Sequence, residues 1–213
     1  MEYPILLALE DFVPVIFGTA GFALLARTAP TEPARTAGLA GATLIGAGGI
    51  AKCVWKLGYA SGAGDWKLLE QALFPLMAAG AVLLSWSLAV TVRRGRPTRF
   101  WPFALAFGLC LAGSVAAGSL DPLFVAATLG VTAVSVLGAI VAGRYRLWWA
   151  VSLYVLGLVL VMGLVPLRSS DSHHTVAFQW LEQSINTAAQ GCLLVAAWLT
   201  LRASRPALIG ASR

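Results

Sequence analysis

Residues 173–200 read HHTVAFQWLEQSINTAAQGCLLVAAWLT and combine a polar stripe with a long apolar segment. On a helix with 100° per residue, five polar side chains fall within about 60° of Asn186: Thr175, Gln179, Glu182, Gln183 and Gln190. Residues 192–201 are apolar nearly all round and end at Arg202, which is typical of a membrane-spanning helix. Carboxylates and amides facing lipid would cost several kcal/mol each, so we expect the stripe to face protein or water.

The whole composition is that of a membrane protein. The 213 residues are 59% hydrophobic and 11% charged, and their mean hydropathy is +0.81. We predict an all-α integral membrane protein, a bundle of seven transmembrane helices in a single transmembrane domain, 1–213. The predicted spans are 5–26, 37–58, 68–92, 101–119, 122–143, 147–167 and 176–201. We expect the first span to stay in the mature protein, because it lacks a basic start and carries Glu10 and Asp11.

The distribution of charge predicts the orientation. Eleven basic residues lie in every second loop and in the C-terminal tail: Arg27, Arg35, Arg93, Arg94, Arg96, Arg99, Arg144, Arg146, Arg202, Arg205 and Arg213. The other face holds four, Lys52, Lys56, Lys67 and Arg168, and eight of the nine acids, all but Glu32. By the positive-inside rule, the N-terminus is outside and the C-terminus cytoplasmic. The net charge of +6 is therefore a topology signal, and we expect no nucleic-acid partner.

Two of the spans share a sequence pattern. WKLLEQALFPLMAAGAVLLSW (66–86) aligns without a gap with FQWLEQSINTAAQGCLLVAAW (178–198), and each has Leu-Glu-Gln with a Trp sixteen residues after the Glu. A duplicated three-helix unit predicts a 3+1+3 arrangement of parallel repeats, 1–95 and 120–205, joined by a linker helix at 100–119. This layout is similar to that of SWEET-type sugar transporters and PQ-loop proteins, although the chain lacks a Pro-Gln motif. The resemblance implies a substrate site at the repeat interface.

The second span carries two lysines four residues apart. Lys56 lies near the outer end and is expected to extend its side chain to the interface. Lys52 is about 6 Å deeper and needs a carboxylate partner. The acids available at that depth are Glu10, Glu70 and Glu182. Pro75 is expected to open the helix backbone just after Glu70.

Small and hydroxylated residues predict how the spans pack. Five glycines of the second span should permit close helix approach: Gly38, Gly41, Gly46, Gly48 and Gly49. In the fifth span, Thr128, Thr132 and Ser135 share one face and are expected to form hydrogen bonds between helices.

The predicted site is one-sided and lies in the outer half of the bundle. Its candidate binding residues are Glu10, Lys52, Trp55, Glu70, Gln71, Gln179, Trp180, Glu182, Gln183, Asn186 and Gln190. We predict neither cofactor nor metal, because Cys-x-x-Cys, HExxH and a phosphate loop are absent and the three cysteines lie singly within apolar spans. The loop RSSDSHH, 168–174, leaves open a pH-sensitive lid.

Three functions fit this pattern. The first is a transporter or channel-like protein that binds a small polar solute or cation in the outward-side pocket. The second is a membrane-embedded enzyme, comparable in general design to integral-membrane terpene cyclases, in which Glu70 and Glu182 act as acid and base on a lipid or isoprenoid. The third is a receptor or accessory membrane subunit. The sequence leaves open whether the protein is an enzyme.

The expected surroundings follow from the same composition. Membrane lipids and a small molecule or ion are the predicted partners, and a homo-oligomer remains open. Arg outnumbers Lys by twelve to three beside abundant Ala, Gly and Leu, which is typical of a GC-rich bacterial genome. We therefore expect a multi-pass protein of the cell membrane, the inner membrane of a bacterium.

Overall fold

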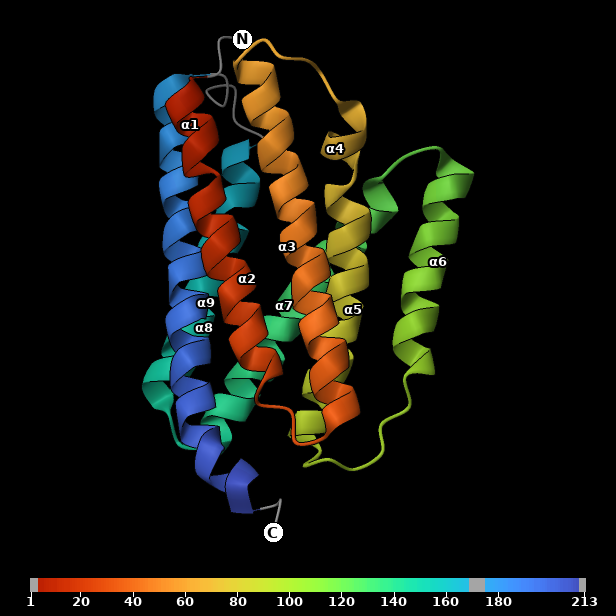
Figure 1. Cartoon of the computed structure of the whole chain (residues 1–213), viewed down its shortest axis with the longest axis vertical. Coiled ribbons are helices and arrows are strands. Elements are labelled where there is room, and N and C mark those ends of the chain that lie inside the picture. The colour runs from red at the N-terminus through yellow and green to blue at the C-terminus, as the bar shows by residue number, and fades with distance from the viewer. Residues whose placement is uncertain (1–3, 169–174, 211–213) are drawn as a thin grey trace.

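The computed structural model describes residues 4–168 and 175–210, and every regular element in these two ranges is a helix (Figure 1). The helices are α1 (Ile5–Glu10), α2 (Phe12–Ala26), α3 (Glu32–Ala60), α4 (Lys67–Gln71), α5 (Leu73–Val92), α6 (Trp101–Ala117), α7 (Asp121–Arg144), α8 (Trp148–Arg168) and α9 (Val176–Gly210). The all-helical prediction is confirmed.

Six helices form a closed ring, in the order α2, α3, α5, α7, α8, α9 and back to α2. They meet in a shared apolar core, to which each contributes buried side chains, among them Phe22, Ile45, Leu84, Val134, Tyr154 and Leu193. The predicted linker helix is α6, which lies outside the ring against α5 and α7 (Figure 1).

The closest helix crossing joins α3 and α5 through two glycines. A Cβ atom on Gly41 would lie 2.5 Å from the carbonyl oxygen of Gly80, and one on Gly80 would lie 2.5 Å from the carbonyl oxygen of Gly41. Only hydrogen fits at both positions, so the two backbones touch directly. The other glycines predicted to allow close approach also lie at contacts with neighbouring side chains or backbone: Gly38, Gly46, Gly48 and Gly49. The small-residue prediction is confirmed.

The hydroxyls of α7 behave differently from the prediction. Thr128 donates to the carbonyl of Phe124 at 2.9 Å, and Thr132 to that of Thr128 at 2.8 Å. Ser135 likewise donates to the carbonyl of Val131 at 3.1 Å. Each hydroxyl therefore donates to the carbonyl four residues earlier in its own helix. The prediction of hydrogen bonds between helices was wrong. A hydroxyl at this position reaches its own i−4 carbonyl without needing a partner helix.

Five helical segments are long and apolar enough to cross a membrane: Ile5–Ala26, Glu32–Ala60, Lys67–Val92, Asp121–Arg144 and Val176–Ser204. Trp101–Ala117 and Trp148–Leu164 are apolar but shorter. The fold is compatible with membrane insertion. Seven crossings and their orientation remain predictions.

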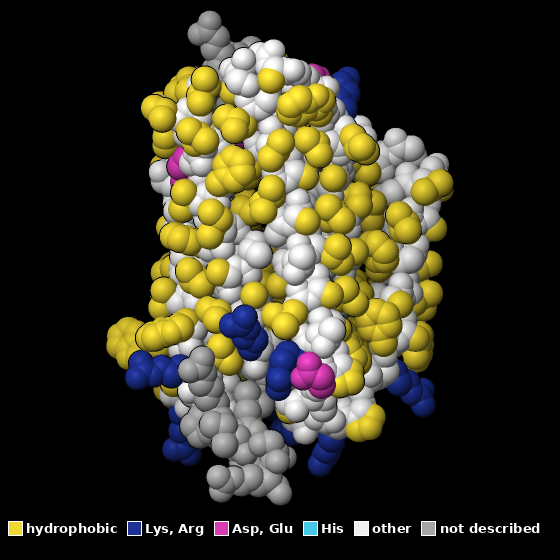
Figure 2. Space-filling model, viewed as in Figure 1, with side chains coloured by type: hydrophobic (Ala, Val, Ile, Leu, Met, Phe, Trp, Pro, Cys, Tyr) yellow, Lys and Arg dark blue, Asp and Glu magenta, His cyan; other side chains and the backbone are white. Residues whose placement is uncertain are grey.

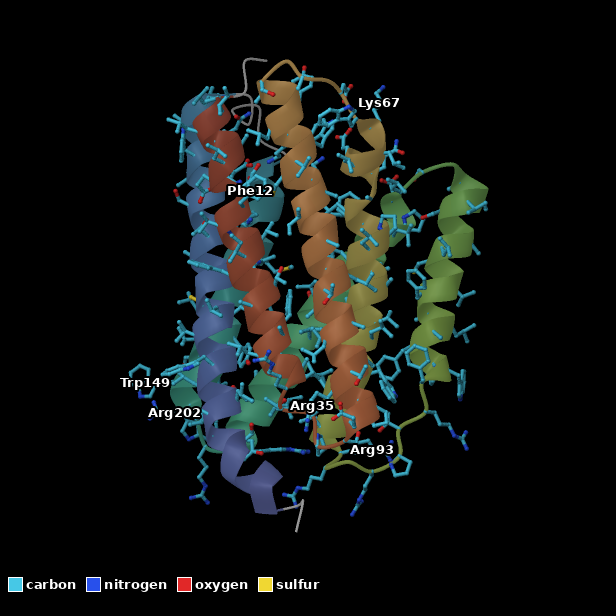
Figure 3. All side chains as sticks on the ribbon, viewed as in Figure 1. Phe12, Arg35, Lys67, Arg93, Trp149 and Arg202 are labelled. Carbon is cyan, nitrogen blue, oxygen red and sulfur yellow. The ribbon has the colours of Figure 1, made fainter. Side chains whose placement is uncertain are left out.

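The distribution of side chains on the surface is also compatible with membrane insertion. Figure 2 shows large apolar side chains covering the sides of the bundle, with Lys and Arg gathered at one end. We call this end the basic end; Arg35, Arg93 and Arg202 lie there, whereas Lys67 lies at the opposite end (Figure 3). We call that opposite end the acidic end, because α1, α4 and the start of α9 place their carboxylates there. The first and last helices of the chain, α1 and the end of α9, lie at opposite ends of the bundle.

Candidate functional site

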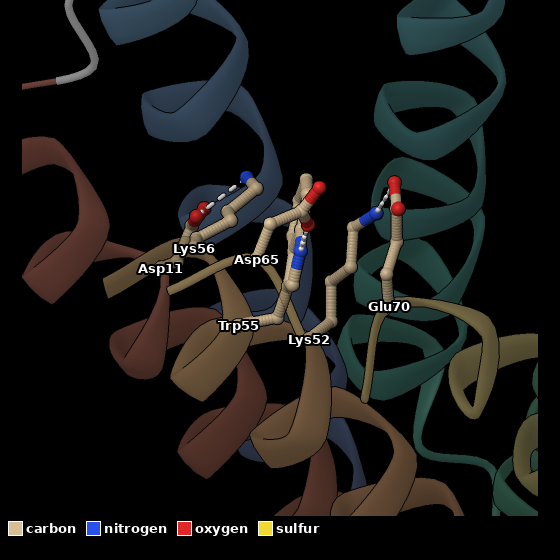
Figure 4. Close-up of polar contacts among 6 residues, drawn as sticks. All are labelled: Asp11, Lys52, Trp55, Lys56, Asp65 and Glu70. Carbon is tan, nitrogen blue, oxygen red and sulfur yellow. Dashed lines mark hydrogen bonds and ion pairs between the residues drawn. The ribbon is translucent and has the colours of Figure 1, made fainter. Parts of the chain in front are cut away.

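Two lysines of α3 hold two carboxylates at the acidic end (Figure 4). Lys52 Nζ lies 3.1 Å from Glu70 Oε1, and Lys56 Nζ lies 2.5 Å from Asp11 Oδ2. The lysines are four positions apart, about one helical turn, so both project from the same end of α3. Lys52 reaches Glu70 of α4, and Lys56 reaches Asp11 between α1 and α2. The sequence left three acids open for Lys52, and the structure selects Glu70. The expectation that Lys56 only extends to the interface was wrong, because its ammonium group pairs with Asp11.

Each of these carboxylates lies where a helix is interrupted. The first span breaks at Asp11, between α1 and α2, and the third breaks at Ala72, between α4 and α5. In both spans a proline follows three residues later, Pro14 and Pro75. Proline has no N–H, so it cannot close the helical hydrogen bond to the residue four positions earlier. The break after Glu70 is the one that Pro75 predicted.

Two adjacent acids, Glu10 and Asp11, contact different helices. Asp11, with 8% of its side chain exposed, pairs with Lys56 of α3. Glu10 instead accepts a hydrogen bond from Thr187 of α9, whose Oγ1 lies 2.6 Å from Glu10 Oε1. Asp11 keeps helical φ and ψ, and neighbouring side chains of a helix diverge by about 100°, so the two acids reach different helices.

Glu10 has one carboxylate oxygen that accepts no hydrogen bond from the described residues. Its Oε2 is buried and has no hydrogen-bond partner among the described residues. Neither of the two acidic-end ion pairs includes it. An unpaired carboxylate inside an apolar bundle is costly unless it binds a proton, a cation or a hydrogen-bond donor.

The stripe on α9 continues from Glu10 along the contact with α2. Glu182 and Gln183 are each only 8% exposed. Gln183 Nε2 and Gln190 Oε1 are buried without a hydrogen-bond partner in the described part of the chain. Gln190 points at Gly18 of α2, where a Cβ would lie 2.7 Å from its Oε1. The stripe therefore faces protein, as predicted, and two of its amides have hydrogen-bonding atoms to offer.

The other predicted residues of α9 are less enclosed. Asn186 and Gln179 are half-buried, and 37% of Trp180 is exposed. Trp180 is thus at the rim of the helix contact and not in its interior. Asn186 lies one residue before Thr187, whose hydroxyl holds Glu10.

An aromatic cluster borders the Lys52 pair. Trp55 Nε1 donates to Asp65 Oδ1 at 2.8 Å, and the Lys52 ammonium lies 4.3 Å from the centre of the Trp55 ring. Trp55 also stacks on Tyr59, with ring centres 6.0 Å apart. A cation over an aromatic face is held by the ring quadrupole, so Trp55 steadies the lysine.

The predicted residues form two groups rather than one pocket. Glu70 lies on α4, which packs on α3 and α5, whereas Glu182 lies on α9, which packs on α1, α2, α7 and α8. Gln71 is exposed on α4 and borders a separate hollow of about 370 Å³. That hollow lies between α5, α6 and α7, and the buried hydroxyl of Ser114 in its wall has no hydrogen-bond partner within the described ranges.

Four residues at the acidic end were not among the candidate binding residues that the sequence indicated. Asp11, Lys56 and Thr187 each bind a charged group of the site, and Asp65 holds Trp55. The Lys52 and Lys56 spacing was a usable signal that both lysines need acids. Nothing in the sequence marked Thr187, because its partner Glu10 is far away along the chain.

Two further expectations concern ligands. The residues that the structure describes contain no cluster of three or more His, Cys, Asp and Glu side chains able to hold a metal ion. Residues 169–174 of the predicted lid, His173 and His174 among them, lie outside the described ranges. The lid therefore stays a prediction.

The fold and site together define an all-helical bundle, compatible with insertion into a membrane, that encloses polar and charged groups at one end. The chain matches no protein-family model, no curated protein and no solved structure. Its function is therefore argued from its own residues.

Proposed function

We propose that the protein is a multi-pass transporter of the cell membrane that moves a small polar solute or cation, with the N-terminus outside and the C-terminus cytoplasmic. Five long apolar helices and two shorter ones support seven crossings. The acidic end then faces outward and the basic end faces the cytoplasm, as the distribution of Arg favours. The composition favours a bacterial inner membrane.

One observation carries the proposal: three buried polar atoms without partners among the described residues lie on the facing helices α1 and α9. They are Glu10 Oε2, Gln183 Nε2 and Gln190 Oε1. Leaving such atoms unsatisfied in an apolar bundle costs about 1–3 kcal/mol each. A bound solute or cation that supplies the missing contacts would offset that cost.

The atoms define the chemistry of the substrate. Glu10 and Gln190 offer oxygen acceptors, and Gln183 offers an N–H donor. A ligand with an ammonium or hydroxyl group and one acceptor matches this set, as does a cation that keeps a water. Because Thr187 holds only one oxygen of Glu10, the other is available to the ligand. We therefore assign Glu10 as the substrate- or ion-binding carboxylate, with the α9 stripe beside it.

The interrupted helices support transport. In many transporters the substrate lies beside discontinuous helices, whose free backbone groups line the site. Here α1/α2 and α4/α5 are each interrupted at one residue that keeps helical φ and ψ, followed by a proline that lacks an N–H, and each is tied to α3 by one lysine pair. We propose that these two pairs form a latch at the outward end, which must open for a solute to pass.

The order of helices in the ring supports the proposed repeat. The first unit contributes the neighbours α2, α3 and α5, and the second contributes α7, α8 and α9 in the same order. The contacts α5 with α7 and α9 with α2 then join the units at two equivalent interfaces. The proposed solute site lies at the second of these, between α9 and the first span.

The alternative functions are less well supported by the geometry. An enzyme with Glu70 and Glu182 as acid and base needs both carboxylates at one substrate, but they lie on helices with different neighbours, and Glu70 is paired with Lys52. In a receptor or accessory subunit that binds no solute here, Glu10 Oε2 and Gln190 Oε1 would stay buried without a hydrogen-bond partner.

The test is transport by the purified full chain in proteoliposomes. Labelled amines, amino acids, polyols and monovalent cations are supplied in counterflow, and lipid products are measured in the same sample. We expect counterflow of at least one solute or cation, and loss of it in Glu10→Gln. The matched control is Asp121→Asn, an exposed acid at the same end that binds only Ser119 in its own turn. A lipid product without counterflow, or full counterflow by Glu10→Gln, would contradict the proposal.

A further inference from the structure

A second hollow lies at the basic end, far from the proposed solute site. It measures about 550 Å³ and is bounded by the start of α3, the last turns of α5 and the loop that follows α5. Its lining residues are Thr31, Pro33, Trp86, Val90, Gly95, Arg96, Pro97, Thr98 and Arg99. The hollow thus has a mainly apolar wall, and two exposed arginines, Arg96 and Arg99, border it.

The loop wall is fixed in place by its own contacts. Trp86 Nε1 donates to the carbonyl of Thr98 at 2.9 Å, and the Trp86 ring meets Phe100 edge to face with centres 5.7 Å apart. Gly95, at a left-handed φ of 78°, returns its N–H to the carbonyl of Val90 at 3.0 Å. Arg96 and Arg99 are therefore carried on a loop that is anchored on both sides to α5.

The two arginines have no acidic partner in the described residues. The acid next to the hollow is Glu32, which lies between the lining residues Thr31 and Pro33, and its carboxylate already pairs with Arg35 at 3.2 Å. The other acids of the described residues lie at the acidic end of the bundle. A guanidinium binds a phosphodiester through paired charge-assisted hydrogen bonds, so the missing partner is an anion of this shape.

The position of the hollow indicates a lipid rather than a soluble phosphate. Pro33, Trp86, Val90 and Pro97 give it an apolar wall. Beside it, Trp101 is 58% exposed, as expected of a ring at a membrane interface. Figure 2 shows the apolar sides of the bundle ending where the Lys and Arg side chains begin. An acyl chain fits the apolar part and a phosphate fits the arginines.

We propose that this hollow binds one anionic phospholipid of the inner leaflet, with its phosphate between Arg96 and Arg99 and the start of an acyl chain against Trp86 and Val90. Basic pockets at the cytoplasmic side of helix bundles are a recurrent place for acidic headgroups. A lipid here would join α3, α5 and the loop that leads to α6, and so hold the peripheral helix α6 against the ring. The site is independent of the proposed solute site.

The test uses native mass spectrometry of the full-length protein titrated with phosphatidylglycerol, with phosphatidylcholine and with inorganic phosphate. We expect one saturable phosphatidylglycerol, and an affinity at least about tenfold weaker in Arg96→Gln/Arg99→Gln, since two charge-assisted bonds are lost. Arg27→Gln/Arg146→Gln removes the same charge from two arginines that do not line the hollow, and should keep the lipid.

Three results would overturn the proposal. Equal binding of phosphatidylcholine would remove the need for an anionic headgroup. Binding of inorganic phosphate as tight as that of the lipid would make the site one for a soluble anion. An equal loss in the Arg27→Gln/Arg146→Gln control would show a general charge effect. Trp86→Phe supplies a second variant, because it removes the hydrogen bond to Thr98 that holds the loop and part of the apolar wall but keeps both arginines, and we expect it to weaken phosphatidylglycerol binding by a smaller factor.

Discussion

Removing either lysine of α3 tests how firmly the latch at the acidic end is held. Lys56→Met and Lys52→Met keep most of the side-chain volume and delete one ammonium group each. Asp11, the partner of Lys56, is 8% exposed, whereas Glu70, the partner of Lys52, is 38% exposed. Breaking a fully buried pair costs about 3–5 kcal/mol and breaking an exposed one about 0.2–1 kcal/mol.

The free energy of unfolding should therefore fall by different amounts in Lys56→Met and Lys52→Met. Because Lys56 itself is 25% exposed, we expect Lys56→Met to lower the free energy of unfolding by about 2–3 kcal/mol, below the fully buried range. Lys52→Met should lower it by about 1 kcal/mol. Adding Asp11→Asn to Lys56→Met should recover part of the loss, because the uncompensated charge is then gone.

The assay is reversible unfolding in mixed micelles, followed by circular dichroism as SDS is increased. The two lysine variants share a helix and differ by one turn, so each controls for the other. Equal losses, or a larger loss for Lys52→Met, would refute the argument that burial of the acid sets the strength of each pair. Strict additivity of Asp11→Asn and Lys56→Met would show that the pair contributes nothing.

Three further results are expected. Gly80→Ala should cost about 2–3 kcal/mol in the same unfolding assay, since its Cβ would meet a backbone oxygen at 2.5 Å, whereas Gly108→Ala, with open space around it, should change stability by less than about 0.5 kcal/mol. A reporter fused after Arg213 should be cytoplasmic and one inserted at 169–172 external; both on one side would remove the seven-crossing topology. Glu182→Gln should abolish transport and leave the melting temperature unchanged, and a fully active variant would exclude Glu182 from the site.

The fold class and much of its packing could be predicted from local sequence. Apolar length predicted the helices, and the glycines of α3 predicted a close helix contact although not its partner α5, because both features depend on residues near each other in the chain. Pro75 predicted the break between α4 and α5 for the same reason. The prediction for the hydroxyls of α7 was wrong, because a Thr side chain can donate to a carbonyl of its own helix, as Thr128 does.

The candidate site was only partly predictable, because it depends on which helices become neighbours. The sequence showed that Lys52 needed an acid but offered three. It also treated Glu70 and Glu182 as a pair on the strength of a shared Leu-Glu-Gln, whereas the ring places different neighbours around each. The role proposed for Glu10 depends on a contact with Thr187 that no local pattern indicates.

Access to the interface between α2 and α9 from the two sides of the membrane tests the transport proposal most directly. Gly191 lies there, and a Cβ on it would meet Phe17 at an ordinary 3.8 Å, so Gly191→Cys is expected to fold once Cys53, Cys110 and Cys192 are replaced by alanine. An impermeant thiol reagent is applied to right-side-out and inside-out vesicles.

A transporter exposes its site alternately to each side, so we predict that Gly191→Cys reacts in both kinds of vesicle. An excess of a transported solute should slow the reaction in both. Labelling from the outer side alone would mean a dead-end pocket, and would contradict the proposal that this interface is a transport site.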